Sequence, residues 1–233
     1  MKKEIKIKKR MDKIYLGISW FISISLFIAI FLSFYEKNWI NLFVSILALF
    51  LVTLPKLFQK RFNVRLPLEF QTAIVIFIYA SVFLGEVLKF YHRFWWWDSL
   101  LHCLSGLALG FIGFLIIYIL NKKGKFKANP LWIVIFSFSF AIALGTVWEI
   151  FEFAMDSVFA LDMQRARYSI EIIKAYGSSR IVILDSMRDL IIDSIGALIA
   201  SIMSYIYLIK GDVPIYTRLI RKFEEGNPGL FEK

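Results

Sequence analysis

The stretch SLLHCLSGLALGFIGFLIIYIL, residues 99–120, contains no Asp, Glu, Lys or Arg and is apolar almost throughout. An α-helix needs about 20 such residues to cross the hydrocarbon core of a bilayer. Five more stretches have a similar apolar content, and they are residues 14–35, 39–54, 70–88, 131–153 and 183–208. The sequence therefore predicts an all-α membrane protein built as a bundle of six transmembrane helices. We expect the second helix to end where Pro55 follows it.

The overall composition also favours a membrane protein. Hydrophobic residues make up 59% of the 233 residues, whereas an ordinary soluble domain contains roughly 45–50%. The net charge of +10 makes nucleic acid an alternative partner. In a chain this apolar, basic segments lying against anionic lipid headgroups explain the charge better. We therefore expect the lipid bilayer as the partner and no nucleic acid.

The distribution of Lys and Arg predicts the orientation, because loops rich in these residues stay in the cytoplasm. With the N-terminus inside, 20 of the 28 basic residues fall in cytoplasmic segments and seven in outer ones. The prediction is a multi-pass protein of the inner (plasma) membrane with both termini cytoplasmic. Its predicted parts are a basic tail at 1–13, a transmembrane domain at 14–209, an outer loop at about 154–180 and a cytoplasmic tail at 210–233.

Ionisable residues gather at the ends of the last three predicted spans, where their cost in a membrane makes them functional candidates. The fourth span begins with Asp98 and His102, the fifth ends with Glu149, Glu152 and Asp156, and the sixth begins with Asp185, Arg188, Asp189 and Asp193. The acidic residues and the histidine recur every three or four positions, so each set occupies one face of its helix. The alternating direction of the spans places all three sets at the outer side of the membrane.

So many carboxylates cannot all stay charged together unless cations accompany them. Protonation, pairing with Arg188 and a divalent metal ion are the three remedies. Carboxylates with one imidazole suit a hard or borderline ion such as Mg²⁺, Mn²⁺, Fe²⁺ or Zn²⁺. The hypothesised metal ligands are Asp98, His102, Glu149, Asp185 and Asp189.

Two further residues have hypothesised catalytic roles. Glu152 is a candidate general base, and Arg188 is a candidate binding residue for an anionic group. Simpler roles stay open for several of these side chains. Asp98 is also a favourable helix N-cap, Arg188 a possible structural counter-ion, and acidic groups such as Asp185 are favoured at a helix N-terminus.

Three strings within this cluster carry a family resemblance. They are WWWDSLLHCLSG at 95–106, GTVWEIFEFAMD at 145–156 and DSMRDLIIDSIGA at 185–197. In this order they resemble the YjdF-like family of bacterial integral membrane proteins, over about residues 70–208. The resemblance implies a membrane location and a shared polar site at Asp98, His102, Glu149, Glu152, Asp156, Asp185 and Asp189.

A more distant resemblance links the same residues to VanZ-like membrane proteins, which are associated with glycopeptide resistance. The shared order is D-x-x-x-H, then E, then D-x-x-x-(N or D)-x-x-G. This sequence has Asp193 where that pattern has Asn, and it lacks the D-K-x-x-H form.

Three functions are compatible with the sequence. The leading hypothesis is a metal-dependent membrane hydrolase or transferase that acts on a lipid-linked or envelope substrate. The alternatives are a cation- or proton-coupled transporter, because intramembrane carboxylates mark ion pathways, and a structural or assembly protein. The substrate, the metal and the oligomeric state stay open.

Overall fold

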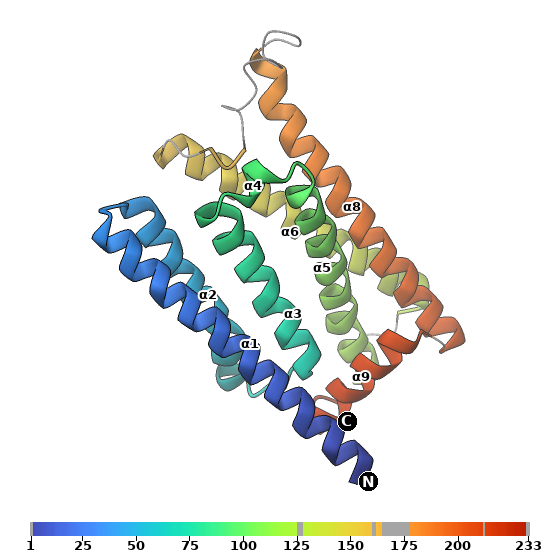
Figure 1. The fold of residues 1–233 in the computed structure, drawn as a ribbon. Helices are drawn as coiled ribbons and strands as arrows, with labels where there is room; N and C mark the ends of the chain where they lie inside the picture. Colours follow the sequence, from blue (N-terminus) through green and yellow to red (C-terminus); the bar gives the residue numbers. More distant parts are fainter. Residues whose placement is uncertain (1, 125–127, 160–161, 165–177, 212, 232–233) are drawn as a thin grey trace. The chain divides into compact units, whose positions relative to one another are not determined.

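The computed structural model describes residues 2–124, 128–159, 162–164, 178–211 and 213–231 (Figure 1). All regular elements within these ranges are helices, and no strand occurs among them. Six helices are long and apolar enough to cross a membrane, and they are Lys13–Tyr35, Trp39–Phe62, Leu68–Val87, Trp97–Lys122, Pro130–Val158 and Ile183–Lys210. The prediction of an all-α membrane protein with six spans is therefore confirmed. The cytoplasmic placement of the two termini stays a prediction.

The chain divides into two compact units. The first unit comprises Met1–Trp97 and Leu219–Gly229, and the second comprises Asp98–Arg218 and Leu230–Lys233. The helices of the first unit are α1 (Lys2–Tyr35), α2 (Trp39–Phe62), α3 (Leu68–Ile78), η1 (Tyr79–Val87) and α4 (Phe90–Arg93). The helices of the second unit are α5 (Trp97–Lys122), α6 (Pro130–Phe159) and α8 (Ser178–Lys210). Helix α9 (Pro214–Gly226) and the short η3 (Pro228–Leu230) follow them in the chain.

In the first unit, α1, α2 and the α3–η1 span pack around a small apolar core (Figure 1). The buried members of this core are Ile22, Leu26, Ala48, Val52, Val75 and Phe83. One polar contact joins α1 to η1, because the Ser25 hydroxyl lies 2.9 Å from the Tyr79 hydroxyl. Many other apolar side chains of these helices are exposed, as expected for surfaces that face lipid.

The second span extends further than the sequence indicated. Pro55 does not end it, because α2 continues to Phe62 with Pro55 buried inside the helix. Proline removes one backbone hydrogen bond from a helix, but helices in a membrane tolerate it where the freed backbone group is satisfied in another way. The helix ends at Asn63, whose left-handed backbone (φ 51°) is a common C-terminal conformation.

The third span is confirmed to within a few residues, and its second half has an unpredicted geometry. Residues Tyr79–Val87 form a π-helix that continues α3. At Gly85 a Cβ would lie 2.2 Å from the Tyr91 ring, so a side chain larger than hydrogen does not fit there without a shift. Hydropathy alone does not distinguish π from α geometry.

In the second unit, α5, α6 and α8 form the bundle that carries the predicted polar residues (Figure 1). Helices α6 and α8 pack along each other. The Ser137 hydroxyl of α6 donates to the Gly110 carbonyl of α5 at 2.5 Å. Helices α5 and α8 approach so closely that a Cβ at Gly106 would lie 2.1 Å from the Asp193 carbonyl oxygen. Glycine therefore brings the two polar helix faces together, as expected for helix packing in membranes.

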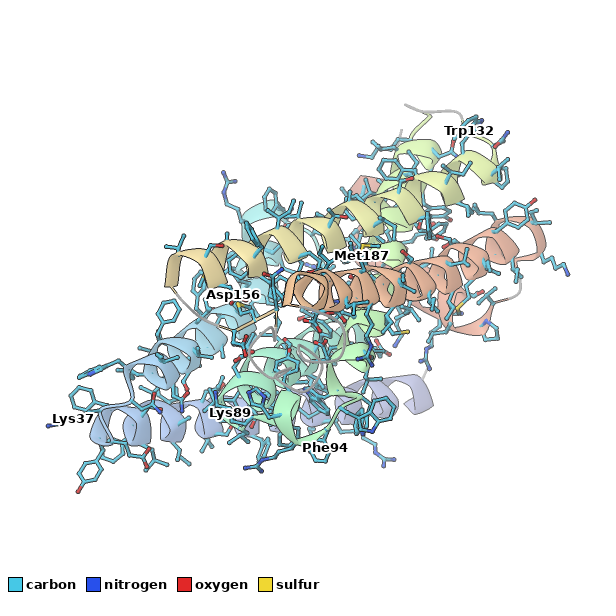
Figure 2. The ribbon with its side chains drawn as sticks, turned by 90° about the horizontal axis from the view of Figure 1, so that it is seen from above. Lys37, Lys89, Phe94, Trp132, Asp156 and Met187 are labelled. Carbon is cyan, nitrogen blue, oxygen red and sulfur yellow. The ribbon has the colours of Figure 1, made fainter. Side chains whose placement is uncertain are left out.

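The outer loop expected at about 154–180 begins later than predicted. Helix α6 continues to Phe159, and α8 already begins at Ser178. Asp156 is therefore a helical residue, and Figure 2 shows it at the opposite end of α6 from Trp132. Residues 154–159 are mostly apolar and contain no Pro or Gly, so nothing in that stretch stops the helix. The rest of the loop lies almost wholly outside the described residues.

The segment predicted as a C-terminal tail contains the amphipathic helix α9. Tyr216, Ile220 and Phe223 recur at helical spacing and are all buried. In the second unit, the Tyr216 hydroxyl donates to the Ala200 carbonyl of α8 at 2.9 Å, and the Tyr216 ring lies 4.8 Å from that of Phe111 on α5. The end of the bundle away from the polar residues is thus held by aromatic packing.

Candidate functional site

The polar cluster of the second unit is centred on His102 of α5. Helix α5 begins at Trp97, so Asp98 lies in its first turn and His102 follows one turn later on the same face. The Nε2 atom of His102 lies 3.6 Å from Asp98 Oδ1 and 3.8 Å from Asp189 Oδ2. On the other side of the ring, Nδ1 lies 3.2 Å from Asp193 Oδ2. Two acidic side chains of α8 therefore flank one imidazole of α5.

Each member of this central group is buried. The exposed fractions are 8% for Asp98, 7% for His102 and 2% for both Asp189 and Asp193. The two Nε2 distances exceed the 2.7–3.2 Å expected of an N–H···O hydrogen bond, so this side of the ring faces two carboxylates without bonding to either. Two buried carboxylates facing one ring nitrogen gather negative charge in a small volume, so the space between these atoms is a natural place for a cation.

Two of the three distances between these atoms match what a metal ion requires. Asp98, His102 and Asp189 each offer one ligand atom, and these three atoms all lie within 4.8 Å of one another. An ion bound at about 2.0–2.2 Å to each ligand holds the ligand atoms about 3.0–4.2 Å apart, depending on its geometry. The distances of 3.6 and 3.8 Å around His102 Nε2 fall in that range.

A second observation also points to a missing ligand. Asp189 Oδ1 is buried and has no hydrogen-bond partner among the described residues. Glu149 is also buried, at 6% exposed, and the Ser186 side chain lies beside its carboxylate as a hydrogen-bonding neighbour. A buried oxygen without a partner has lost its hydrogen bonds to water and gained none in return. This desolvation typically costs about 1–3 kcal/mol, and more when the group is charged.

The acidic residues of α6 differ in how they are held. Glu152 is buried, and its Oε1 accepts a hydrogen bond from Trp148 Nε1 at 2.9 Å. The Asp156 carboxylate accepts the backbone N–H groups of Met163 at 2.7 Å and Gln164 at 2.9 Å. Asp156 therefore anchors the chain where it leaves α6. Glu149 and Glu152, by contrast, interact electrostatically with His102 and Asp98.

Four predicted site residues lie outside the central group, and they are Glu149, Glu152, Asp185 and Arg188. Asp185 is half-buried one helical turn before Asp189, and Arg188 is exposed. Glu149 and Asp185 are not members of the group whose ligand atoms lie within 4.8 Å of one another. Their roles as metal ligands, and the roles of Glu152 and Arg188 in catalysis, stay predictions.

Among the described residues, the buried side chains of the site carry more acidic than basic groups. Five buried carboxylates accompany one imidazole, and they belong to Asp98, Glu149, Glu152, Asp189 and Asp193. No Lys or Arg is buried in the part of the chain that the structure describes. Bound cations and protons are two ways to balance such charge.

Comparison with known proteins identifies the family of the chain. Residues 18–210, which include every candidate site residue, match the family model described as predicted membrane protein DUF2238. The chain belongs to the DUF2238 family. It is also similar to a protein of Thermotoga maritima described as uncharacterized, with 24% identity over 104 residues, which is 45% of this chain and 53% of the relative. The match thus spans about half of the relative's length, and no solved structure matches the chain.

The structure of this DUF2238 member adds site residues that sequence reasoning missed. Ser105 donates to Asp193 Oδ1 at 2.5 Å, and Trp148 donates to Glu152. Ser105 lies three residues after His102 and Trp148 four residues before Glu152, so helical spacing was the available signal. Neither residue is ionisable, and a search for costly charges in the membrane therefore passes over both.

Proposed function

We propose that the chain binds a divalent metal ion through Asp98, His102 and Asp189, and that it is a membrane hydrolase or transferase acting on a lipid-linked or envelope substrate. The observation that carries the proposal is the buried group of three ligand atoms within 4.8 Å of one another. The unpartnered Asp189 Oδ1 supports it independently.

The donor set suits the chemistry proposed. Two carboxylates and one imidazole bind Zn²⁺, Mn²⁺ or Fe²⁺ well. Three protein ligands also leave coordination positions open, which is typical of catalytic rather than structural sites. A metal in such a site activates a bound water or polarises a substrate oxygen.

The remaining acidic residues supply roles around this centre. Glu149 is buried, and it interacts electrostatically with His102, so it is a candidate for a further ligand or for the group that receives a proton. Glu152 is the candidate general base, with its carboxylate oriented by Trp148. Asp185 is a candidate outer ligand, and the exposed Arg188 is a candidate binding residue for a phosphate or another anionic group.

The position of the site along the helices supports a substrate in the outer leaflet or the envelope. Asp98 and His102 lie in the first turns of α5, Glu149 and Glu152 in the last third of α6, and Asp189 in the first half of α8. The orientation predicted from the Lys and Arg distribution places these helix ends outside.

A hydrolysis assay tests the proposed activity. Metal-loaded protein in mild detergent is incubated with phospholipids and polyprenyl phosphates, and release of phosphate or headgroup is followed by ³¹P NMR. We expect turnover by the wild type and a loss of about 100-fold or more in Glu152→Gln, because removal of a general base typically costs 10²–10⁴-fold. Ser139→Ala, on α6 but distant in sequence from Glu152, is the matched control.

The alternative of a cation- or proton-coupled transporter rests on the same buried carboxylates within the spans. Reconstituted vesicles separate the two functions. A metal or proton flux through the wild type that Asp189→Asn abolishes, with no turnover of any lipid substrate, would replace the enzymatic proposal by transport.

A further inference from the structure

We propose that Asp193 is a positioning residue that fixes the tautomer and orientation of the His102 ring, so that Nε2 presents its lone pair toward Asp98 and Asp189. This inference rests on the proposed metal site, and it assigns a function to the most deeply placed acidic residue of α8. Asp193 would not touch the metal or the substrate. It would act through His102.

The direction of the hydrogen bond determines the tautomer. Asp193 Oδ2 lies 3.2 Å from His102 Nδ1, and an ionised carboxylate can only accept a hydrogen bond. The proton of a neutral imidazole is therefore held on Nδ1, and the lone pair is left on Nε2. That nitrogen is the one that faces Asp98 and Asp189, at 3.6 and 3.8 Å.

The Asp193 carboxylate is itself held in place from α5. Ser105 Oγ lies 2.5 Å from Asp193 Oδ1 and 2.8 Å from the His102 carbonyl oxygen, both of which are acceptors. The single hydroxyl proton lies toward the shorter contact, so Ser105 donates to the oxygen that His102 does not use. Each oxygen of Asp193 thus has its own donor from the same helix.

Glycines on two other helix faces leave the space that this arrangement needs. A Cβ at Gly145 of α6 would lie 2.8 Å from Asp193 Oδ2, the atom that bonds to His102. A Cβ at Gly106 of α5 would lie 2.1 Å from the Asp193 carbonyl oxygen. Asp193 is 2% exposed, so it occupies a fitted position among α5, α6 and α8 and is not a solvated charge.

This geometry has a known consequence for metal sites. A histidine ligand that donates its second N–H to a carboxylate is fixed in orientation and becomes a stronger donor. Loss of such a partner typically weakens metal affinity by about 10–100-fold. We expect the same order of loss here when the carboxylate of Asp193 is replaced.

The test compares wild type with Asp193→Asn and Ser105→Ala in detergent. Zn²⁺ affinity is measured by chelator competition, and the His102 tautomer by ¹⁵N NMR of histidine-labelled protein in a His92→Gln background. We expect Asp193→Asn to bind Zn²⁺ about 10–100-fold more weakly and to lose the Nδ1–H signature. Ser105→Ala keeps the carboxylate, so we expect a smaller loss of affinity. Ser194→Ala, the next residue on α8, is the control and should match the wild type.

The outcomes separate this inference from the metal proposal. Wild-type affinity and an unchanged tautomer in folded Asp193→Asn would overturn the role of Asp193 and leave the metal site standing. If the wild type binds neither Zn²⁺ nor Mn²⁺ nor Fe²⁺, both the metal site and the role of Asp193 are overturned. If Asp193→Asn does not fold, the inference is tested on two other observations. It is overturned if the His102 ring of the wild type carries its proton on Nε2 and if Ser105→Ala has the same Zn²⁺ affinity and the same tautomer as the wild type.

Discussion

Adding Zn²⁺ or Mn²⁺ to the metal-free protein is expected to raise its unfolding temperature by about 5–10 °C. A ligand present at 100 times its dissociation constant stabilises the folded state by about 2.7 kcal/mol, and each kcal/mol corresponds to about 2–4 °C for a chain of this size. In Asp189→Asn the rise should disappear, because this substitution removes one of the three grouped ligands. The measurement is thermal unfolding in detergent with and without metal.

The metal-free state of the same variant distinguishes a functional carboxylate from a structural one. If the acidic cluster exists to bind a cation, removing one buried charge relieves repulsion, and metal-free Asp189→Asn should be at least as stable as the metal-free wild type. A structural role predicts the opposite, a loss of stability without metal. Ser201→Ala, also buried on α8, is the control and should keep the full metal response.

Substituting Gly196 by Leu is expected to separate α5 from α8 and to abolish the site. A Cβ at Gly196 would lie 2.1 Å from the Cys103 carbonyl oxygen and 2.9 Å from the Leu107 nitrogen, and both atoms belong to the backbone of α5. A helix backbone cannot move aside as a flexible side chain can, so the cost should exceed the usual 1–3 kcal/mol of overpacking. We expect the unfolding temperature to fall by about 10 °C or more.

The matched control is Gly17→Leu on α1, where nothing lies within 4 Å of the added Cβ. Metal binding should fall together with stability in Gly196→Leu. Cys103 is next to His102 in the sequence, so a shift of α5 at Cys103 would also displace the His102 side chain. A variant that unfolds at the wild-type temperature would show that the two helices do not approach as the structure describes.

Most of the fold could be predicted because one physical signal dominates it. A membrane-spanning helix needs about 20 apolar residues, and six stretches meet that condition. The errors lie where that signal says little. Pro55 was expected to end a helix because proline removes a backbone hydrogen bond, whereas α2 continues past it to Phe62. The π-helix at Tyr79–Val87 has the same hydropathy as an α-helix would.

Part of the candidate site was predictable for a related reason. The cost of charge in a membrane drew attention to Asp98, His102 and Asp189, and the alternating direction of the spans predicted that they meet. Sequence could not rank the acidic residues further. The separation of Glu149 and Asp185 from the three grouped ligands depends on how the helices are rotated and shifted along their axes, which spacing does not fix.

The supporting residues were harder to predict than the charged ones. Ser105 acts through one hydrogen bond to Asp193, and Gly145 acts by leaving room for the Asp193 carboxylate. Neither effect changes the hydropathy or the charge of the sequence in a way that predicts it. Asp193 was visible as a deep carboxylate, but only the 3.2 Å contact with Nδ1 distinguishes a partner of the histidine from another ligand.

Elemental mass spectrometry of the purified protein tests the metal proposal most directly. The protein is extracted in mild detergent, reloaded with Zn²⁺, Mn²⁺ or Mg²⁺, desalted and analysed beside His102→Ala and Asp189→Ala. His92→Ala, which replaces the other of the two histidines, is the control. Monodisperse elution from size exclusion establishes that each variant is folded. We predict about one metal ion per chain in the wild type and the control, and its loss in both site variants. A wild type that retains no metal after reloading, or site variants that retain as much as the wild type, would contradict the proposed centre.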